Sequence, residues 1–227
     1  MEFIKNAEAI SRESMNKVNP TLVSQFTSVI RFLACHPDKA SASRGGRSAP
    51  PIGSKEYIHR QAEVFSRARN PRAPQKPATI PDEMVSVILV SYFGICQSAV
   101  ERIKREHQLS MGAENMVGEL LERYLASVLE PQGWIWCSGS IVKAIDFIKP
   151  PATAKNDWQL LQVKNRDNSE NSSSSTIRDG TNIKKWYRTF SRTGGLNWEA
   201  FPDDLLKAQL SENAFKAFVC EYLTKLR

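Results

Sequence analysis

Three polar side chains in the second half of the chain could carry out metal-assisted chemistry on a phosphate. Asp146 lies in the apolar segment 141–148, and Gln162 and Lys164 lie two residues apart in the segment 158–164. Both segments predict β-strands, so Gln162 and Lys164 share one face, and Asp146 meets them if the strands pair. A carboxylate is a hard oxygen ligand for Mg²⁺, and an ammonium group stabilises phosphate charge or orients a water molecule. The alternative interpretation is a structural ion pair between Asp146 and Lys164.

The helix expected before these strands, at residues 110–130, carries the further candidate acids Glu114, Glu119 and Glu122. At about 100° per residue, Glu114 is expected inside the apolar stripe of this helix, whereas Glu119 and Glu122 are expected to face outwards. A carboxylate on a packed face needs a metal or a hydrogen-bond partner, so Glu114 is the first candidate and Glu119 the second. The alternative is that Glu114 only interacts with the helix dipole in the first turn. The candidate metal ligands are Asp146, Glu114 and the backbone carbonyl of Val163.

The elements that must position these residues follow from periodicity and from Pro and Gly. Other helices are expected within residues 1–36 and at 54–69, 81–106, 182–191 and 208–226. The order of helix, strand, strand and helix predicts an α/β fold with its sheet in the second half of the chain.

The composition is that of a globular protein with an anionic partner. The 227 residues include 31 Lys and Arg against 24 Asp and Glu, a net charge of +7, with 41% apolar and 24% charged residues. These values exclude a disordered, collagenous or disulfide-stapled chain. No segment has the length and apolarity of a membrane span, and the N-terminus has no apolar core typical of a signal peptide. The four scattered cysteines disfavour zinc and disulfides, and we expect a cytoplasmic protein.

Segment 37–81 is rich in Pro and Gly and carries most of the excess positive charge of the first half. Arg44, Arg47, Arg67 and Arg69 are expected to contact nucleic-acid phosphates through counterion release. A solvated surface loop is the alternative.

The site motif resembles the core of the PD-(D/E)xK nucleases. In that comparison Ile145-Asp146-Phe147 ends the first strand, a proline-containing loop follows, and Leu161-Gln162-Val163-Lys164 forms the second, with Gln162 in place of an acid. The block KNRDNSENSSSS at 164–175 and KKWYR at 184–188 are similar to type II restriction endonucleases, most closely the SinI-like family. The similarity extends over nearly the whole chain.

This resemblance implies a restriction-endonuclease-like fold, with a mixed central sheet flanked by helices and a helical N-terminal region. It implies a single nuclease domain over residues 1–227. Residues 1–109 would form a helical and basic-loop part that clamps DNA. Residues 110–227 would form the catalytic α/β core, with a recognition segment at 165–191.

The implied activity is Mg²⁺-dependent hydrolysis of both strands of double-stranded DNA at a short palindrome-like site, of the GGWCC kind, by a homodimer. A cognate DNA methyltransferase would act on the same site without needing to bind the nuclease. By the same resemblance Asp146 would bind metal, Gln162 would occupy the position of the second acid, and Lys164 would be the catalytic lysine. Because a neutral amide binds Mg²⁺ less well than a carboxylate, either Glu114 supplies the missing charge or the site holds one ion.

The segment that follows Lys164 is suited to reading DNA. Short Asn and Ser side chains offer donors and acceptors to base edges, and guanidinium groups bind guanine in a bidentate manner. The residues expected to contact DNA here are Asn165, Arg166, Asn168, Asn171, Ser173, Arg178, Lys184, Lys185 and Arg188. A solvated loop is the alternative for this segment. For the whole protein, the alternatives are a structure-specific repair nuclease with the same core and a non-catalytic DNA-binding protein.

Overall fold

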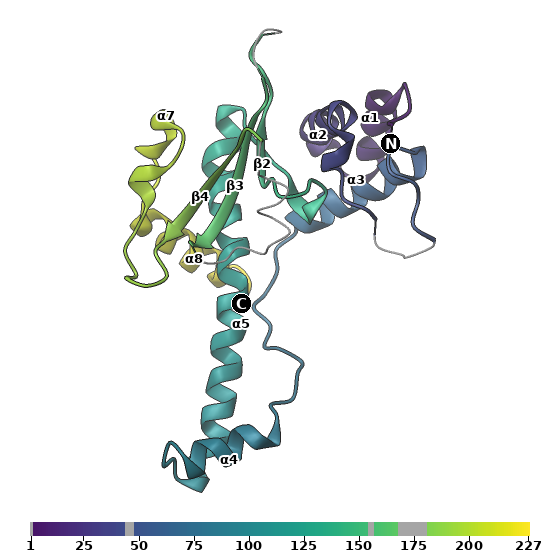
Figure 1. Ribbon diagram of the computed structural model, residues 1–227. Coiled ribbons are helices and arrows are strands. Elements are labelled where there is room, and N and C mark those ends of the chain that lie inside the picture. Colours follow the sequence, from purple (N-terminus) through teal and green to yellow (C-terminus); the bar gives the residue numbers. More distant parts are fainter. Residues whose placement is uncertain (1, 44–47, 154–156, 168–180) are drawn as a thin grey trace.

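A four-stranded mixed sheet lies between two groups of helices in the computed structural model (Figure 1). The structure describes residues 2–43, 48–153, 157–167 and 181–227. The architecture is α/β, with helices before and after the sheet, and this confirms the expected fold class.

Three α-helices form the N-terminal group, close to the expected positions. They are α1 (Ala7–Val18), α2 (Val23–Cys35) and α3 (Lys55–Arg69). Ser54 caps α3, because its side chain accepts a hydrogen bond from the Tyr57 backbone N–H. Short 3-10 turns, η1 (Pro20–Leu22) and η2 (Pro37–Lys39), flank α2.

The next two helices are divided differently from the prediction. Helix α4 (Glu83–Ser91) ends before a turn, and α5 (Gln97–Leu129) then runs for 33 residues. The expected break near residues 107–109 was wrong, because His107, Gln108 and Leu109 are all compatible with a helix. The break occurs instead at Gly94, whose φ of +66° is the left-handed conformation that favours glycine.

The sheet has the strand order β1-β2-β3-β4. The strands are β1 (Ile135–Trp136), β2 (Phe147–Lys149), β3 (Gln159–Arg166) and β4 (Ile183–Thr189). β2 pairs antiparallel with both β1 and β3, whereas β3 and β4 are parallel. The strand at 158–164 is thus confirmed, and the strand at 141–148 is shortened to its last residues. Ala144, with φ +56°, turns the chain where the longer strand was expected.

The helix expected at 182–191 was wrong, since this segment is strand β4. Ile183, Trp186 and Thr189 are its buried residues, and their spacing of three is also typical of a helix. A strand covered on both faces can bury residues at odd spacings, which explains the misassignment.

The two faces of the sheet pack against different groups of helices. Ile148 and Leu160 belong to the core formed with α1–α3, whereas Phe147 and Leu161 belong to the core formed with α5 and the C-terminal helices. Those C-terminal helices are α7 (Asp204–Lys207) and α8 (Glu212–Thr224), in place of one expected helix at 208–226. Ser211 caps α8 by accepting from the Ala214 N–H. No helix in the described ranges is long and apolar enough to cross a membrane.

Candidate functional site

Asp146 lies where β2 begins, between the neighbouring strands on either side. Its backbone N–H donates to the Leu161 carbonyl at 2.9 Å, and its carbonyl accepts from the Cys137 N–H at 2.8 Å. Its side chain continues the same ladder, because Oδ2 accepts from the Val163 N–H at 2.7 Å. The carboxylate therefore accepts the hydrogen bond that a backbone carbonyl of a longer β2 would otherwise accept. This bond fixes the orientation of the Asp146 side chain.

β3 extends past β2 at this point. The β2–β3 pairing ends at Phe147 opposite Leu161, whereas the β3–β4 pairing continues to Arg166. Beyond Phe147 the regular pairing gives way to the two hydrogen bonds that Asp146 makes with Leu161 and Val163. The N–H and C=O of one strand residue face the same neighbour, so the Val163 carbonyl points to the side from which Asp146 accepts its hydrogen bond.

Gln162 and Lys164 are the residues of β3 that the sequence assigned to the site. Gln162 is buried, at 1% exposure, and Lys164 is half-buried. The positive charge of Lys164 lies close enough to lower the pKa of Asp146 against the rise caused by burial. The ion pairs among the described residues do not include one between Asp146 and Lys164. The structure thus brings Lys164 near Asp146 without the simple ion pair of the alternative interpretation, and Gln162 precedes the strand residue that bonds the Asp146 side chain.

Glu122 of α5 is the helix carboxylate that reaches this site. Its Oε2 accepts a hydrogen bond from the Trp136 indole Nε1 at 2.9 Å. Burial raises the pKa of Glu122 to about 8, and the nearby negative charge of Asp146 adds to the rise, while Trp136 and Lys164 oppose it. Two half-buried carboxylates therefore lie close together at this site.

The expectation that Glu114 faces inwards and Glu122 outwards was wrong. Glu114 is exposed and lies about 12 Å from Glu122 along the axis, at a rise of 1.5 Å per residue. Around Glu122, nearly every residue from Leu120 to Ala126 is buried, because this part of α5 is enclosed by the body of the protein. Position along the helix, not rotation about it, decides which acid enters the site.

The donor set suits a hard divalent cation. The like charges of Asp146 and Glu122 are destabilised by burial and by each other, and a bound cation would remove both penalties. No group of three or more His, Cys, Asp or Glu residues suited to a metal occurs in the parts of the chain that the structure describes. The two carboxylates would therefore need the Val163 carbonyl, Gln162 or solvent oxygens to complete the coordination.

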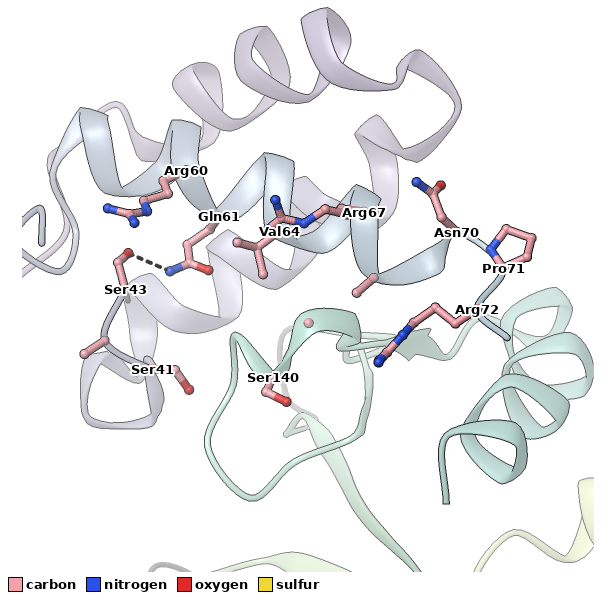
Figure 2. Close-up of a pocket in the computed structure, with 13 residues that line it drawn as sticks. Ser41, Ser43, Arg60, Gln61, Val64, Arg67, Asn70, Pro71, Arg72 and Ser140 are labelled. Carbon is pink, nitrogen blue, oxygen red and sulfur yellow. Dashed lines mark hydrogen bonds between the residues drawn. The ribbon is translucent and has the colours of Figure 1, made fainter. Parts of the chain in front are cut away.

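A basic cavity lies between α3 and the turn η5 (Ser138–Ser140). Its volume is about 830 Å³, and Figure 2 shows Ser43, Arg72 and Ser140 around it. Arg60 and Arg67 also line it. Gly139 permits the close approach, since a Cβ there would lie 2.7 Å from Val64 Cγ1. From this turn the chain reaches Asp146 within six residues.

Only part of the expected DNA-contacting set can be placed. Arg67 lines the cavity as expected for a phosphate contact. Arg60 and Arg72 line the cavity too. They were not among the expected DNA contacts, because their positive charge was the only feature of the sequence that pointed to them. Arg166 and Lys184 are exposed, and Lys185 is half-buried. The expected residues Arg44, Arg47, Asn168, Asn171, Ser173 and Arg178 lie outside the described residues.

Two of the expected DNA contacts are engaged within the protein. Arg188 donates to both carboxylate oxygens of Glu212 at 2.7 and 2.8 Å and to Asn165 Oδ1 at 3.0 Å. Its side chain is 14% exposed. Arg188 and Asn165 thus join β3, β4 and α8, and this position contradicts the expected base contact.

Arg69 has a comparable internal role. Its guanidinium donates to both Glu130 oxygens at 3.0 and 2.7 Å, to the Trp136 carbonyl at 2.8 Å and to Ser138 Oγ at 3.1 Å. Arg123 lies beside it and donates to the last carbonyls of α3 at 2.8 to 3.0 Å. The pair joins α3 to α5 and to the turn that leads to Asp146, so Arg69 is not available as the phosphate contact expected of it.

We expect Arg69→Met to lower the free energy of unfolding by roughly 3 kcal/mol, because it leaves the half-buried Glu130 carboxylate without its ion-pair partner. Urea unfolding followed by circular dichroism measures this change. Arg12→Met is the matched control, since Arg12 forms only a surface pair with Glu8 and is 64% exposed. Equal stabilities of the two variants would contradict the internal role of Arg69.

Comparison with known proteins shows similarity over almost the whole chain. Residues 7–225 match the family model described as SinI restriction endonuclease. The chain is 51% identical over 224 residues to the type II restriction enzyme Eco47I of Escherichia coli, covering 99% of this chain and 97% of that protein. It is also 51% identical over 225 residues to the type II restriction enzyme SinI of Salmonella infantis, again covering 99% and 97% of the two chains.

Proposed function

Because the chain belongs to the SinI restriction endonuclease family and is a type II restriction endonuclease, we propose that Asp146, Glu122 and Lys164 form its active site. The observation that carries this proposal is the convergence of two half-buried carboxylates and a lysine at the point where β3 extends past β2. The substrate is DNA, and the reaction we propose is Mg²⁺-dependent hydrolysis of one phosphodiester bond in each strand.

Each residue has a distinct task in this proposal. Asp146 and Glu122, with the Val163 carbonyl, would hold Mg²⁺, which when bound neutralises phosphate charge and makes water a better nucleophile. Lys164 stabilises the negative charge that develops on the phosphate, or holds the attacking water by donating a hydrogen bond. The Val163 N–H keeps Asp146 oriented toward the metal position.

Gln162 takes the place of the second acid without supplying a charge. Its side chain is buried, and it alternates along β3 with Leu161 and Val163, which pack in the core with α5. We infer that Glu122 supplies the negative charge absent at Gln162. Glu122 thus replaces Glu114 in the role that the sequence suggested for a helix acid.

The proposed substrate site is a short palindrome-like sequence of the GGWCC kind, as the family resemblance implies. A homodimer would present one active site to each strand, since one copy of the site can attack only one strand at a time. Base reading would fall to the segment 165–191, of which Arg166, Lys184 and Lys185 are described members. The protein would act in the cytoplasm, where a cognate DNA methyltransferase protects the same sequence.

Plasmid cleavage with end mapping tests this function. Purified protein with Mg²⁺ should convert a plasmid of known sequence into fragments whose ends all fall at GGWCC, and EDTA should abolish the reaction. Cleavage at every sequence, or only at junctions and lesions, would favour a repair nuclease. Binding without cleavage at any Mg²⁺ concentration would favour a non-catalytic DNA-binding protein.

The basic cavity between α3 and η5 is proposed to hold the DNA backbone. We expect Arg60→Ala with Arg67→Ala to weaken specific and non-specific binding alike, because phosphate contacts carry no base information. The slope of log affinity against log salt should become shallower by about 2, at about 0.9 for each phosphate that the protein no longer neutralises. Fluorescence anisotropy over a salt series measures both quantities.

Arg12→Ala with Arg31→Ala removes the same charge from α1 and α2, outside the residues that line this cavity. This control should leave the salt slope nearly unchanged. A changed cleavage pattern with an unaltered slope in the Arg60 and Arg67 variant would instead make the cavity a base-reading site.

A further inference from the structure

Residues 80–111 form an arm that projects away from the sheet. The arm consists of α4, the turn at Gly94 and the first half of α5, and Figure 1 shows it extending well beyond the other elements. The candidate active site lies elsewhere, at the second half of α5 and the strands. The proposed chemistry therefore gives the arm no task.

The arm carries most of the exposed apolar surface of the protein. Nine of the twelve exposed large apolar side chains among the described residues lie on it. They are Ile80, Met84, Val85, Val87, Ile88, Tyr92, Phe93, Leu109 and Met111. Two of them, Ile80 and Tyr92, are 91% and 82% exposed. Exposed apolar side chains gathered on one projecting element mark a contact surface on a folded protein.

Helix α4 is apolar on both sides. Its sequence EMVSVILVS has apolar residues at nearly every rotation, yet none of its residues, all of which the structure describes, is buried. Leu89 and Val90 are half-buried. In the order in which they follow one another around the helix axis, the exposed residues Val87, Met84 and Val85 cover about 160° of the helix surface, at 100° per residue. A helix of this composition is normally enclosed, so α4 lacks a cover on its outer side.

The charge of the arm argues against a nucleic acid and for a second copy of this chain. Four acids and three bases give the arm a net charge of −1, which leaves 28 bases and 20 acids, or +8, on the other residues. DNA would bind the basic body in preference to the arm. Two copies that met through their bodies would repel, whereas an apolar, nearly neutral surface is complementary to itself, as a two-fold interface requires.

The arm is held in one orientation relative to the body. The extended segment before α4 runs along α5, where a Cβ at Gly112 would lie 2.8 Å from the Gln75 carbonyl oxygen. Gln108 Nε2 donates to the Thr79 carbonyl at 3.0 Å, and Lys104 Nζ donates to Ser86 Oγ at 3.2 Å. These contacts present the apolar patch as a fixed surface.

We propose that the arm is the surface through which two copies of this chain form the homodimer. The inference rests on the proposed function, which needs two active sites, and it names the surface that joins them. A standard interface takes about 800 Å² and 20–30 residues from each partner. An arm of 32 residues with nine large apolar side chains is of that size.

The test compares two double variants that introduce the same charges at exposed apolar positions. Ile88→Glu with Phe93→Glu alters the arm, where these residues are 52% and 64% exposed. Leu196→Glu with Leu205→Glu is the matched control away from the arm, at 53% and 85% exposure. Circular dichroism and urea unfolding establish that both variants fold, and sedimentation equilibrium over a dilution series gives the mass and the dissociation constant.

Wild type and the control variant should sediment at twice the 25.6 kDa chain mass. For the arm variant the dissociation constant should rise about 100-fold or more, because each interface anchor that is removed weakens association on the order of tenfold or more. Association of the wild type should persist at high salt, since apolar burial drives it.

Cleavage of plasmid by the wild type separates failure of this inference from failure of the proposed function. A wild type that cuts at a specific sequence but is monomeric, or an arm variant that remains a dimer, would overturn the arm interface and leave the function intact. A dimeric wild type that never cuts DNA would refute the proposed function but would not contradict the arm interface. A monomeric wild type whose arm binds zwitterionic lipid vesicles would make the arm a membrane contact and would also overturn the inference.

Discussion

Lys164→Ala should nearly abolish DNA cleavage, lowering the single-turnover rate by about 10²- to 10³-fold, while DNA binding survives. Removing one preorganised donor from a site of developing charge costs 10²–10³ in rate, and Lys164 is the cation whose charge reaches both Asp146 and Glu122. Asp146→Asn should have an effect of the same order, because the amide removes a proposed metal ligand. Quenched-flow cleavage of a short duplex measures the rate, and anisotropy with Ca²⁺ in place of Mg²⁺ measures binding.

Lys207→Ala is the control for this experiment. Lys207 pairs with Asp204 on α7 and is 33% exposed, so its loss should leave the rate close to that of the wild type. A Lys164→Ala enzyme that still cuts at near the wild-type rate would remove the active-site assignment. Equal losses of binding and cleavage would make Lys164 a DNA contact instead of a residue of the chemical step.

Glu122→Gln should reduce Mg²⁺-dependent turnover by about 100-fold, on the order expected for loss of one electrostatic contribution. The Mg²⁺ concentration needed for half-maximal rate should rise as well, since a carboxylate ligand becomes an amide. Glu114→Gln makes the same chemical change on the same helix at an exposed position, and it should behave as the wild type. Rates over a Mg²⁺ series decide between them, and similar effects of both substitutions would refute the role of Glu122.

The same Glu122→Gln substitution should stabilise the protein when divalent cations are absent. In the folded state the pKa of Glu122 rises from 4.5 to about 8, so the folded state holds its proton more tightly than the unfolded state. Stability from this group is therefore present below about pH 4.5 and is lost as pH rises toward 8. The free energy gained by Glu122→Gln should grow over that window, and a pH-independent difference would contradict the buried position of the carboxylate.

The strand part of the site could be predicted because its determinants are local. Alternation placed Gln162 and Lys164 on one face of β3, and the antiparallel pairing with β2 brings the Asp146 carboxylate to the Val163 N–H. The N-terminal helices also followed from periodicity, as did α3 with its Ser54 cap. These features depend on residues within a few positions of one another.

The helix part of the site could not be predicted, because it depends on how far the body of the protein extends along α5. Helical rotation alone favours Glu114, but that residue lies in the section near the arm, whereas Glu122 lies where the helix is enclosed. The roles of Arg69 and Arg188 failed for a related reason. Their partners Glu130 and Glu212 are distant in sequence, so nothing local distinguished a buried ion pair from a DNA contact.

Packing of α1–α3 against the Leu160 face of the sheet limits how such an enzyme can acquire a new target. Ile148 and Leu160 share their core with Phe26, Phe32 and other residues of these helices. Exchanging the N-terminal helices for another module would leave that face of the sheet in water, because α1–α3 complete the core on which the sheet is packed. New specificity must therefore come from substitutions and loop changes within one continuous core, where each change is also a change in folding stability.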